Sequence, residues 1–340
     1  MEDLLVSSWC KDRAVPETYI FPPEQRPGKL IDVPVGNNIP VVDLGVHDQT
    51  QIIQQIFEAS QDFGFFQVIN HGVPNRLMDD AMSVFKEFHA MSAKDKTFEC
   101  SKDPNKSCSV YTGSQNYAKE KFHLWRDGLL HLCNPQEKYI QFWPEKPTRY
   151  REIVGTYTTV VRKLGFRILE FISQGLGISP VHFSSGLAEN PRLLVNHYPP
   201  CPDPSLTLGQ GKHRDPSIIN ILLQSEVYGL QVFKDEEWIG VKPIPYAFVV
   251  NIGYPLQIIS NGKLKGAEHR VVTNSNLART TASFFINPLD ETIIEPAKTL
   301  VDASNPALYR SLLYKNFLIK YIATSGNTQA LEEALSSSTE

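Results

Sequence analysis

The sequence lacks an excess of positive charge. Its 340 residues include 33 Lys and Arg against 37 Asp and Glu, which gives a net charge of −4. Proteins that bind nucleic acid normally carry a basic surplus, so no nucleic-acid partner is expected. No apolar run approaches the roughly 18 residues needed to cross a bilayer, so no membrane partner is expected either. The chain starts with the acidic Glu2 and Asp3, whereas a secretory signal opens with positive charge; this predicts a cytoplasmic protein.

Cysteines are few, odd in number and widely spaced, at positions 10, 100, 108, 133 and 201. Without a Cys-x-x-Cys pair, neither a disulfide framework nor a thiolate zinc site is expected, and the thiols should be reduced. Glycine is outnumbered by proline, with 20 Gly against 24 Pro. So many prolines disfavour helical bundles, because proline interrupts a helix interior. The hydrophobic fraction of 41% is that of a globular chain, and an α+β or mainly β fold follows.

Helical periodicity is strongest in the first half of the chain. Apolar residues recur at helical spacing in 50–64, 74–91 and 148–175, and again near 305–323. Strand-like runs occur at 39–44 and 65–70, whereas 14–38 should be an extended arm and 99–121 irregular. After Pro191 there are eight short β-type runs: 193–198, 217–224, 229–235, 237–243, 247–253, 256–260, 269–273 and 280–286. Short strands at such spacing predict a sandwich or a jelly roll.

These patterns divide the chain into three parts. Residues 1–185 should form an N-terminal helical region that packs on the core, and residues 186–325 a β core with a closing helix. Residues 326–340 should be a disordered tail, since they end in the polar run SSSTE. No flexible linker separates the first two parts, so we expect one compact unit that works as a monomer.

A metal site is indicated by His213 and Asp215, which form a His-x-Asp pair at the entry to an apolar strand. Alone this pair is a weak signal, because a His-x-acid pair arises about once by chance in a chain of this composition. On an extended strand, however, residues two apart point the same way and can share one cation. His269, in the strand-like EHRVV, could supply a third ligand. Two His and one carboxylate match the facial triad of non-haem Fe(II) oxygenases, with zinc as the main alternative metal.

An anion site is indicated a short distance further along the chain. Arg279 and Thr281 are again two apart on a predicted strand. A guanidinium with an aligned hydroxyl can bind a carboxylate through a bidentate pair and one further hydrogen bond. Tyr198, in NHYPPCP, could add another hydroxyl.

The ordered set of motifs resembles a known family. NHYPPCP, HRD, NILLQ, GLQVF, VVNIG, SNG, HRV and the Arg-x-Thr spacing follow one another as in the plant 2-oxoglutarate- and Fe(II)-dependent dioxygenases of specialised metabolism. IPVVDL, FGFFQVINHGVP and LWRDGL resemble the N-terminal part of the same family, so the likeness covers about residues 15–322. Within the family, the chain is most similar to the hyoscyamine 6-hydroxylase-like group.

The resemblance implies both a fold and a reaction. The fold would be a double-stranded β-helix, or cupin-like jelly roll, flanked by helices. The reaction would be oxidation of a small plant specialised metabolite by hydroxylation, desaturation or ring closure, with release of succinate and CO2. Fe(II), O2 and the co-substrate 2-oxoglutarate would take part, with ascorbate as reductant.

The resemblance also implies roles for individual residues. His213, Asp215 and His269 would ligate Fe(II). Arg279 and Thr281 would hold the distal carboxylate of 2-oxoglutarate, with Tyr198 alongside and Asn196 lining the same pocket. The chain departs from the family pattern without losing these groups; the departures are Thr281 in place of Ser, His197, Arg214, Asn220 and Tyr254.

The substrate is less visible in the sequence. By analogy its pocket should lie between 109–124, the strand of Phe285 and the last helix. Candidates to stack on a planar or apolar substrate are Phe122, Phe285, Phe317 and Tyr321. Arg214 should point away from the metal, yet it could reach the pocket mouth, where it would favour an acidic substrate. The absence of acidic residues in 109–117 disfavours a cationic amine.

Two other classes of protein would also suit a jelly roll. One is a non-catalytic jelly-roll protein that binds a small molecule without turnover, and the other is a zinc hydrolase on a cupin-like barrel. A receptor needs neither the triad nor the Arg clamp, and a hydrolase has no use for Arg279-x-Thr281. The dioxygenase hypothesis is therefore favoured.

Overall fold

The computed structural model describes residues 5–10, 14–28, 33, 35–36, 39–100, 107–114, 117–184, 186–324 and 328–335. The helices are α1 Val6–Trp9, α2 Gln49–Asp62, α3 Asn75–Ala90, α4 Ala93–Glu99, α5 Gln136–Tyr139, α6 Tyr150–Leu176, α7 Tyr254–Ile259, α8 Tyr314–Ala323 and α9 Thr328–Leu335. The strands are β1 Val35–Gly36, β2 Val41–Asp43, β3 Phe65–Ile69, β4 Cys108–Thr112, β5 Asp127–Leu132, β6 Arg192–Tyr198, β7 Gln210–His213, β8 Ile219–Gln224, β9 Leu230–Lys234, β10 Glu237–Val241, β11 Phe248–Ile252, β12 Glu268–Val271, β13 Arg279–Ile286, β14 Ile293–Ile294 and β15 Leu312–Leu313.

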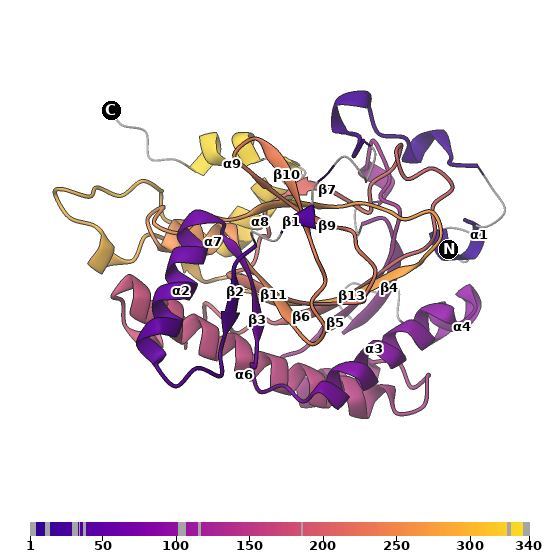
Figure 1. Cartoon of the computed structure of the whole chain (residues 1–340), viewed down its shortest axis with the longest axis horizontal. Coiled ribbons are helices and arrows are strands. Elements are labelled where there is room, and N and C mark those ends of the chain that lie inside the picture. The colour runs from indigo at the N-terminus through magenta and orange to yellow at the C-terminus, as the bar shows by residue number, and fades with distance from the viewer. Residues whose placement is uncertain are drawn as a thin grey trace.

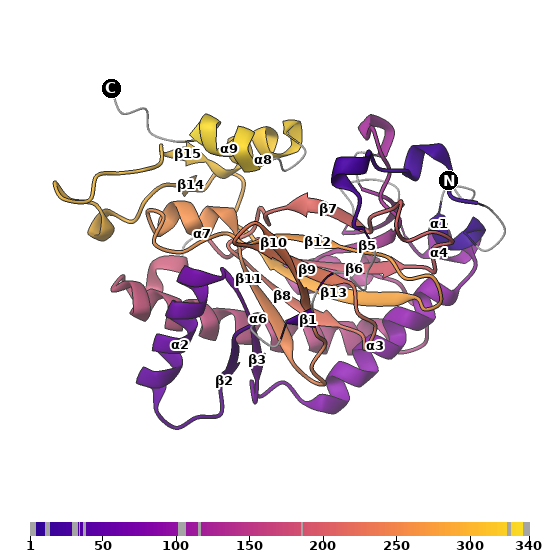
Figure 2. The ribbon, with the colours of Figure 1, turned by 45° about the horizontal axis from the view of Figure 1, so that its top comes forward.

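Two sheets form the walls of a jelly roll, so the predicted double-stranded β-helix is confirmed (Figure 2). The larger sheet has the order β2-β3-β11-β8-β13-β6-β5-β4, and the smaller sheet has the order β1-β10-β9-β12-β7. Strands β8 and β11 are almost entirely buried and rich in Ile and Val, as strands covered on both faces must be. A two-stranded sheet, β14 and β15, lies outside both walls.

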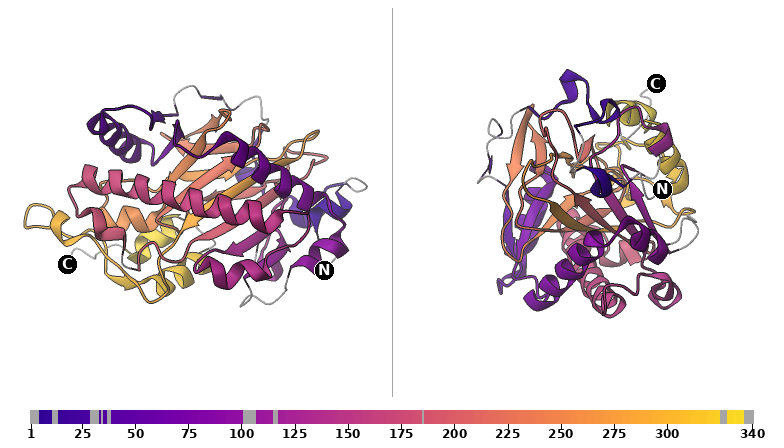
Figure 3. Two further views of the ribbon diagram at one scale, coloured as in Figure 1. Left: turned by 90° about the horizontal axis from the view of Figure 1, so that it is seen from below. Right: turned by 90° about the vertical axis from the view of Figure 1, so that its right-hand side faces the viewer.

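The helices α3 and α6 run along the outer face of the larger sheet, where they contact β13 (Figures 1 and 3). Helix α6 carries an apolar stripe and ends at Gly177, whose φ of 71° is the left-handed conformation that glycine adopts most readily. Gly165, in the middle of this helix, faces Ile286 and Ile221 of the sheet so closely that a Cβ would overlap the Ile286 side chain. This glycine therefore allows the helix to approach the sheet, at a small cost in helix propensity.

Strand β13 separates the apolar core from the interior of the jelly roll. Its residues Ala282, Phe284 and Ile286 are fully buried in the core cluster shared with α6. Because side chains alternate along a strand, Arg279, Thr281, Ser283 and Phe285 point to the opposite face, between the two sheets. We call this space the lumen.

Some local expectations were wrong. Residues 256–260 are not a strand, since 254–259 form helix α7; a short, fully buried apolar run suits either structure, and Pro255 in the first turn favours the helix. The segment 99–121 is not wholly irregular, because β4 pairs with β5. The closing helix begins at Tyr314 and not near 305.

The predicted disordered tail contains helix α9, whose Leu331 and Leu335 are buried in the core cluster. These two leucines form the apolar face of the short helix. The sequence suggested disorder instead, because the polar run SSSTE, which lies outside the described residues, follows them directly. No helix formed by the described residues is both long enough and apolar enough to span a membrane.

Candidate functional site

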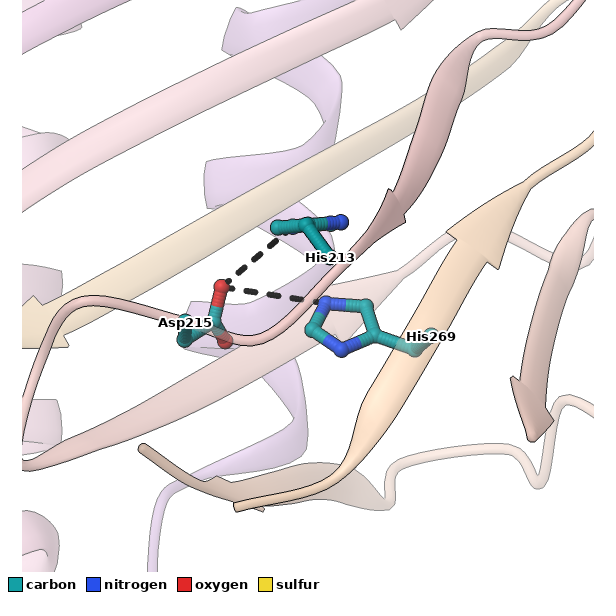
Figure 4. A group of neighbouring side chains, drawn as sticks. All are labelled: His213, Asp215 and His269. Carbon is teal, nitrogen blue, oxygen red and sulfur yellow. Dashed lines mark ion pairs between the residues drawn. The ribbon is translucent and has the colours of Figure 1, made fainter. Parts of the chain in front are cut away.

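Three side chains with metal-ligand chemistry converge at the mouth of the lumen (Figure 4). His213 ends β7, Asp215 follows two residues later, and His269 lies on β12. Strands β7 and β12 are antiparallel and pair His213 directly with His269, so the two rings lie side by side. The Nε2 atoms of His213 and His269 lie 3.6 and 3.7 Å from the same Oδ1 of Asp215, and one ligand atom from each residue lies within 4.8 Å of the others.

Both imidazole rings are oriented by the backbone. Nδ1 of His213 donates to the carbonyl of Gly211 at 2.8 Å, and Nδ1 of His269 donates to the carbonyl of Ala267 at 3.1 Å. A carbonyl only accepts, so each Nδ1 carries the proton and each Nε2 presents a lone pair. Burial and the nearby His213 lower the pKa of His269 to about 4, which keeps that ring neutral and able to ligate.

Asp215 is held by two amides. Its Oδ2 accepts from Nδ2 of Asn220 and from Nδ2 of Asn251, each at 3.1 Å, which leaves Oδ1 facing the histidines. Burial raises the pKa of Asp215, but the nearby His269 and His213 and the amide of Asn251 outweigh burial and hold the pKa well below its usual range. The carboxylate is therefore ionised. Two imidazole Nε2 atoms and one carboxylate oxygen within reach of one point are the donor set that suits Fe(II) with open positions.

The predicted anion site is assembled by strand register. Arg279 pairs with Tyr198 and Thr281 pairs with Asn196 across β13 and β6, which brings all four side chains to the lumen face. Arg279 is 2% exposed, and its Nε and Nη2 donate to the Val227 carbonyl and to Oε1 of Gln224. Within the described ranges no carboxylate pairs with Arg279.

Two further observations indicate that a ligand binds beside Arg279. Gly229 leaves room for the Arg279 side chain, because a Cβ there would lie 2.9 Å from Cδ of Arg279. Oδ1 of Asn196 is buried and has no hydrogen-bond partner in the described part of the protein. A buried cation and a buried orphan acceptor beside it are costly unless a ligand completes them.

The expected substrate residues lie in different surroundings. Phe285 is on the lumen face of β13 and is partly exposed. Phe317 is fully buried in the core, where it stacks on Tyr254 with ring centroids 6.0 Å apart. Phe122 packs on Phe21 of the N-terminal arm, with centroids 5.7 Å apart. Phe317 therefore has a packing role in this structure.

Tyr321, on α8, donates a hydrogen bond from its hydroxyl to the carbonyl of Arg214 at 2.8 Å. Arg214 points away from the metal ligands, as expected, but its Nη1 lies 2.5 Å from Oε1 of Glu332 on α9. The C-terminal helices are thus attached to the segment between two of the ligands. Because Glu332 already matches its charge, Arg214 no longer argues for an acidic substrate.

The departures from the family pattern leave the site intact. His197 faces away from the lumen, where its Nδ1 lies 3.0 Å from the Thr280 hydroxyl and its ring stacks on the buried His89. Tyr254 is buried in α7, and its backbone N–H donates to the carbonyl of Asp215 at 2.9 Å. Asn220 is one of the two amides that hold Asp215.

Two functional positions, Asn220 and Asn251, were not assigned from the sequence. They pair with each other across β8 and β11. Each interrupts an apolar strand, in INILL and in FVVNI. A polar side chain in a buried strand must find a partner, so this interruption was an available signal.

Comparison with known proteins identifies the class to which this fold and site belong. Residues 189–288 match the 2OG-Fe(II) oxygenase superfamily, and residues 39–146 match the non-haem dioxygenase in morphine synthesis N-terminal family. The chain belongs to the 2OG-Fe(II) oxygenase superfamily. It is an oxidoreductase of the dioxygenase type, with Fe(II) and 2-oxoglutarate as its cofactors.

Individual relatives place the chain among plant enzymes of this class. It is 43% identical to hyoscyamine 6-dioxygenase of Hyoscyamus niger, over 94% of each chain. It is 40% identical to flavanone 3-dioxygenase 2 of Oryza sativa subsp. japonica, over 90% of each chain. The crystal structure of JOX2 in complex with 2OG, Fe and JA superposes with a TM-score of 0.86 at 36% identity, over 98% of each chain. The chain is therefore a 2-oxoglutarate-dependent dioxygenase of plant small-molecule metabolism, and the binding-protein alternative is not favoured.

Proposed function

We propose that the enzyme oxidises a small plant specialised metabolite, by hydroxylation or by desaturation or ring closure, and releases succinate and CO2. His213, Asp215 and His269 hold Fe(II). Arg279 and Thr281 bind the distal carboxylate of 2-oxoglutarate, and Tyr198 and Asn196 line the same pocket. Iron with bound 2-oxoglutarate supplies the activation of O2.

One observation carries the proposal. The three ligand atoms lie close together at the smaller sheet, and a buried guanidinium without a carboxylate partner in the described chain lies on the lumen face of the larger sheet. A metal site alone would suit a hydrolase, and an arginine alone would suit any anion. Together they match a co-substrate that both ligates a metal and carries a second carboxylate.

Different side chains position the metal ligands and the co-substrate. The Nδ1–carbonyl hydrogen bonds hold the two imidazoles so that Nε2 faces the metal, and the two amides hold Asp215. Arg279 fixes the far end of the co-substrate in a water-poor lumen, where an ion pair is stronger than in bulk water. A fixed co-substrate and an open metal position leave the organic substrate as the variable part of the site.

The test is turnover of 2-oxoglutarate by the purified protein with Fe(II) and ascorbate. Wild type should form succinate. His213→Ala should reduce succinate to the level without enzyme, whereas His47→Ala, at an exposed position, should leave it unchanged. Arg279→Gln should raise the KM for 2-oxoglutarate about 10- to 100-fold, because a charge-assisted pair is lost. Full turnover by the His213 variant would overturn the metal assignment, and the absence of succinate with wild type would favour a binding protein.

We also propose that the enzyme works as a cytoplasmic monomer. Large apolar side chains that are exposed, such as Phe98, Phe142 and Leu277, come from different segments of the chain. Scattered exposure of this kind is ordinary for a monomer. Sedimentation at working concentration tests the oligomeric state, and a fluorescent fusion tests the location.

A further inference from the structure

A second buried arginine, Arg126, lies just before β5. Its side chain is 8% exposed, and its Nε donates to the carbonyl of Gly113 at 2.8 Å. Its backbone is fixed as well, because its carbonyl accepts from the Gly113 N–H at 2.8 Å and from the Thr112 hydroxyl at 3.3 Å. Arg126 is thus a positioned residue, tied to β4 at both its main chain and its side chain.

Arg126 has no anionic partner among the residues that the structure describes. Nε makes its one hydrogen bond, and no described carboxylate forms an ion pair with it. The neighbouring acid, Glu120, pairs with His123 instead, at 3.1 Å. A buried cation without an anion is costly, and proteins normally pair it.

Other cationic side chains are accommodated in different ways. Arg270, which is 5% exposed, also lacks a described carboxylate partner, but it donates to Gln231 and to the Pro27 carbonyl and lies over the Trp238 ring. Lys96 is 2% exposed; it donates to the Ser7 hydroxyl and lies within the field of Asp127. Arg214 pairs with Glu332. Arg279, by contrast, lacks a described carboxylate partner, and the co-substrate would supply one. Arg126 is like Arg279 in lacking a described carboxylate partner, and it differs from Lys96, which lies within the field of Asp127.

The strand register directs Arg126 to the lumen. Gly128, two residues further along, pairs with Asn196 of β6 on one side and with Tyr111 of β4 on the other. Since side chains alternate, Arg126 projects to the same face as Asn196 and Tyr111. Gly128 makes room for the Tyr111 ring on this face, because a Cβ there would lie 2.7 Å from Cζ of Tyr111.

The electrostatic neighbours of Arg126 place it near the metal ligands. Burial raises the pKa of Tyr321, the charge of Asp215 raises it further, and the charge of Arg126 lowers it. The Tyr321 hydroxyl therefore lies within the fields of both Asp215 and Arg126. Burial also raises the pKa of Tyr111, which the charge of Arg126 opposes. Arg126 and Asp215 are thus both close enough for their charges to act on Tyr321, whose hydroxyl donates to the carbonyl of Arg214.

We propose that Arg126 binds an anionic group, a carboxylate, on the organic substrate, and that the substrate is therefore an organic acid. The Tyr111 hydroxyl, which has no hydrogen-bond partner among the described residues, lies beside Arg126 and can donate to the same anion. This inference rests on the proposed function, since it assigns the substrate end of the same lumen. Arg279 and Arg126 then receive the two different anions, one from the co-substrate and one from the substrate.

The first experiment asks which chemical class is oxidised. A plant leaf extract is separated at pH 7 into anionic, neutral and cationic pools, and each pool is incubated with wild-type enzyme, Fe(II), 2-oxoglutarate and ascorbate. We expect new oxidised masses, with matching succinate, from the anionic pool. Products that come only from the neutral or the cationic pool would overturn the proposal. Succinate formed by the enzyme without extract reports the proposed function separately, because that slow turnover does not depend on Arg126 meeting its substrate.

The second experiment tests the residue. The dissociation constant of the active acid is measured by calorimetry on the Fe(II)- and 2-oxoglutarate-loaded enzyme without O2, alongside that of its methyl ester. Arg126→Gln should weaken binding of the acid about 10- to 100-fold, Arg126→Lys should weaken it less, and the ester should bind both proteins equally. Arg76→Gln, which removes an exposed arginine, is the matched control. Unfolding temperatures establish that each variant is folded, and a folded Arg126→Gln protein that binds the acid like wild type would refute the assignment.

Discussion

Asn251→Leu should weaken the metal site without contacting the metal. Asn251 lies on β11, is 1% exposed, and donates from Nδ2 to Oδ2 of Asp215 at 3.1 Å. Leucine has a similar volume but no donor, so the carboxylate keeps only the amide of Asn220. The Asp215 side chain can then rotate about its last bond, and Oδ1 is less firmly aimed at the two histidines.

The magnitude follows from the kind of hydrogen bond that is lost. A hydrogen bond to a charged group contributes about 1.5–3 kcal/mol, because the alternative is a buried, partly unsatisfied charge. At 1.4 kcal/mol per factor of ten this corresponds to about a 10- to 100-fold loss of metal affinity, which matches the usual effect of removing a partner of a metal ligand. Asn220→Leu should have an effect of the same size, because its distance to Asp215 is also 3.1 Å.

The assay is competition for Fe(II) between the protein and a coloured chelator, without O2. Asn75→Ser serves as the control, because Asn75 is exposed at the start of α3 and far along the chain from the ligands. Unfolding temperatures of the metal-free proteins separate a damaged core from a damaged site. A folded Asn251→Leu protein that holds Fe(II) within twofold of wild type would refute the idea that the amides orient Asp215.

Two further predictions concern the segments that carry the ligands. Gly253→Ala should lower the free energy of unfolding by about 1–3 kcal/mol or prevent folding, because its Cβ would overlap the carbonyl oxygen of Ser217. Gly211→Ala is the control and should lower it less, because a Cβ at Gly211 meets no atom within 4 Å. Equal unfolding midpoints for the two variants would contradict this reasoning. Glu332→Gln should change stability by less than about 1 kcal/mol, since the pair with Arg214 is partly exposed. It should nevertheless speed hydrogen exchange in α9, and unchanged exchange there would show that the ion pair does not hold the helix.

The sequence predicts the jelly roll well because its signals are local and repeated. Short apolar runs with turn residues between them define strands, and α2, α3 and α6 have one apolar face each. Helix α7 was misassigned because all six of its residues, including the polar Gln257, are buried, so the sequence shows no exposed face at helical spacing. Helix α9 was missed because its apolar face becomes visible only once there is a core to cover it.

The metal ligands could be predicted because His213 and Asp215 are only two residues apart in the sequence, and the order of the motifs resembles a family. The hydrogen bonds that hold Asp215 are different, since Asn220 and Asn251 are separated along the chain and meet only through the register of β8 and β11. Arg214 was weighed as a substrate contact because it stands between two ligands. Its partner, Glu332, is more than a hundred residues away and could not be foreseen.

The charge of the lumen differs in sign from the net charge of the whole chain. A chain with a net charge of −4 nevertheless buries Arg279 and Arg126 on the lumen side without a carboxylate among the described residues. Each guanidinium is held by a backbone carbonyl instead, which fixes its position but does not neutralise it. Burying these unpaired charges lowers the stability of the ligand-free protein. An anion that binds restores this free energy, because an ion pair is strong in a low-dielectric space. For the same reason Arg214 is a poor candidate for substrate binding, because Glu332 already neutralises its charge, whereas Arg126 is a good candidate.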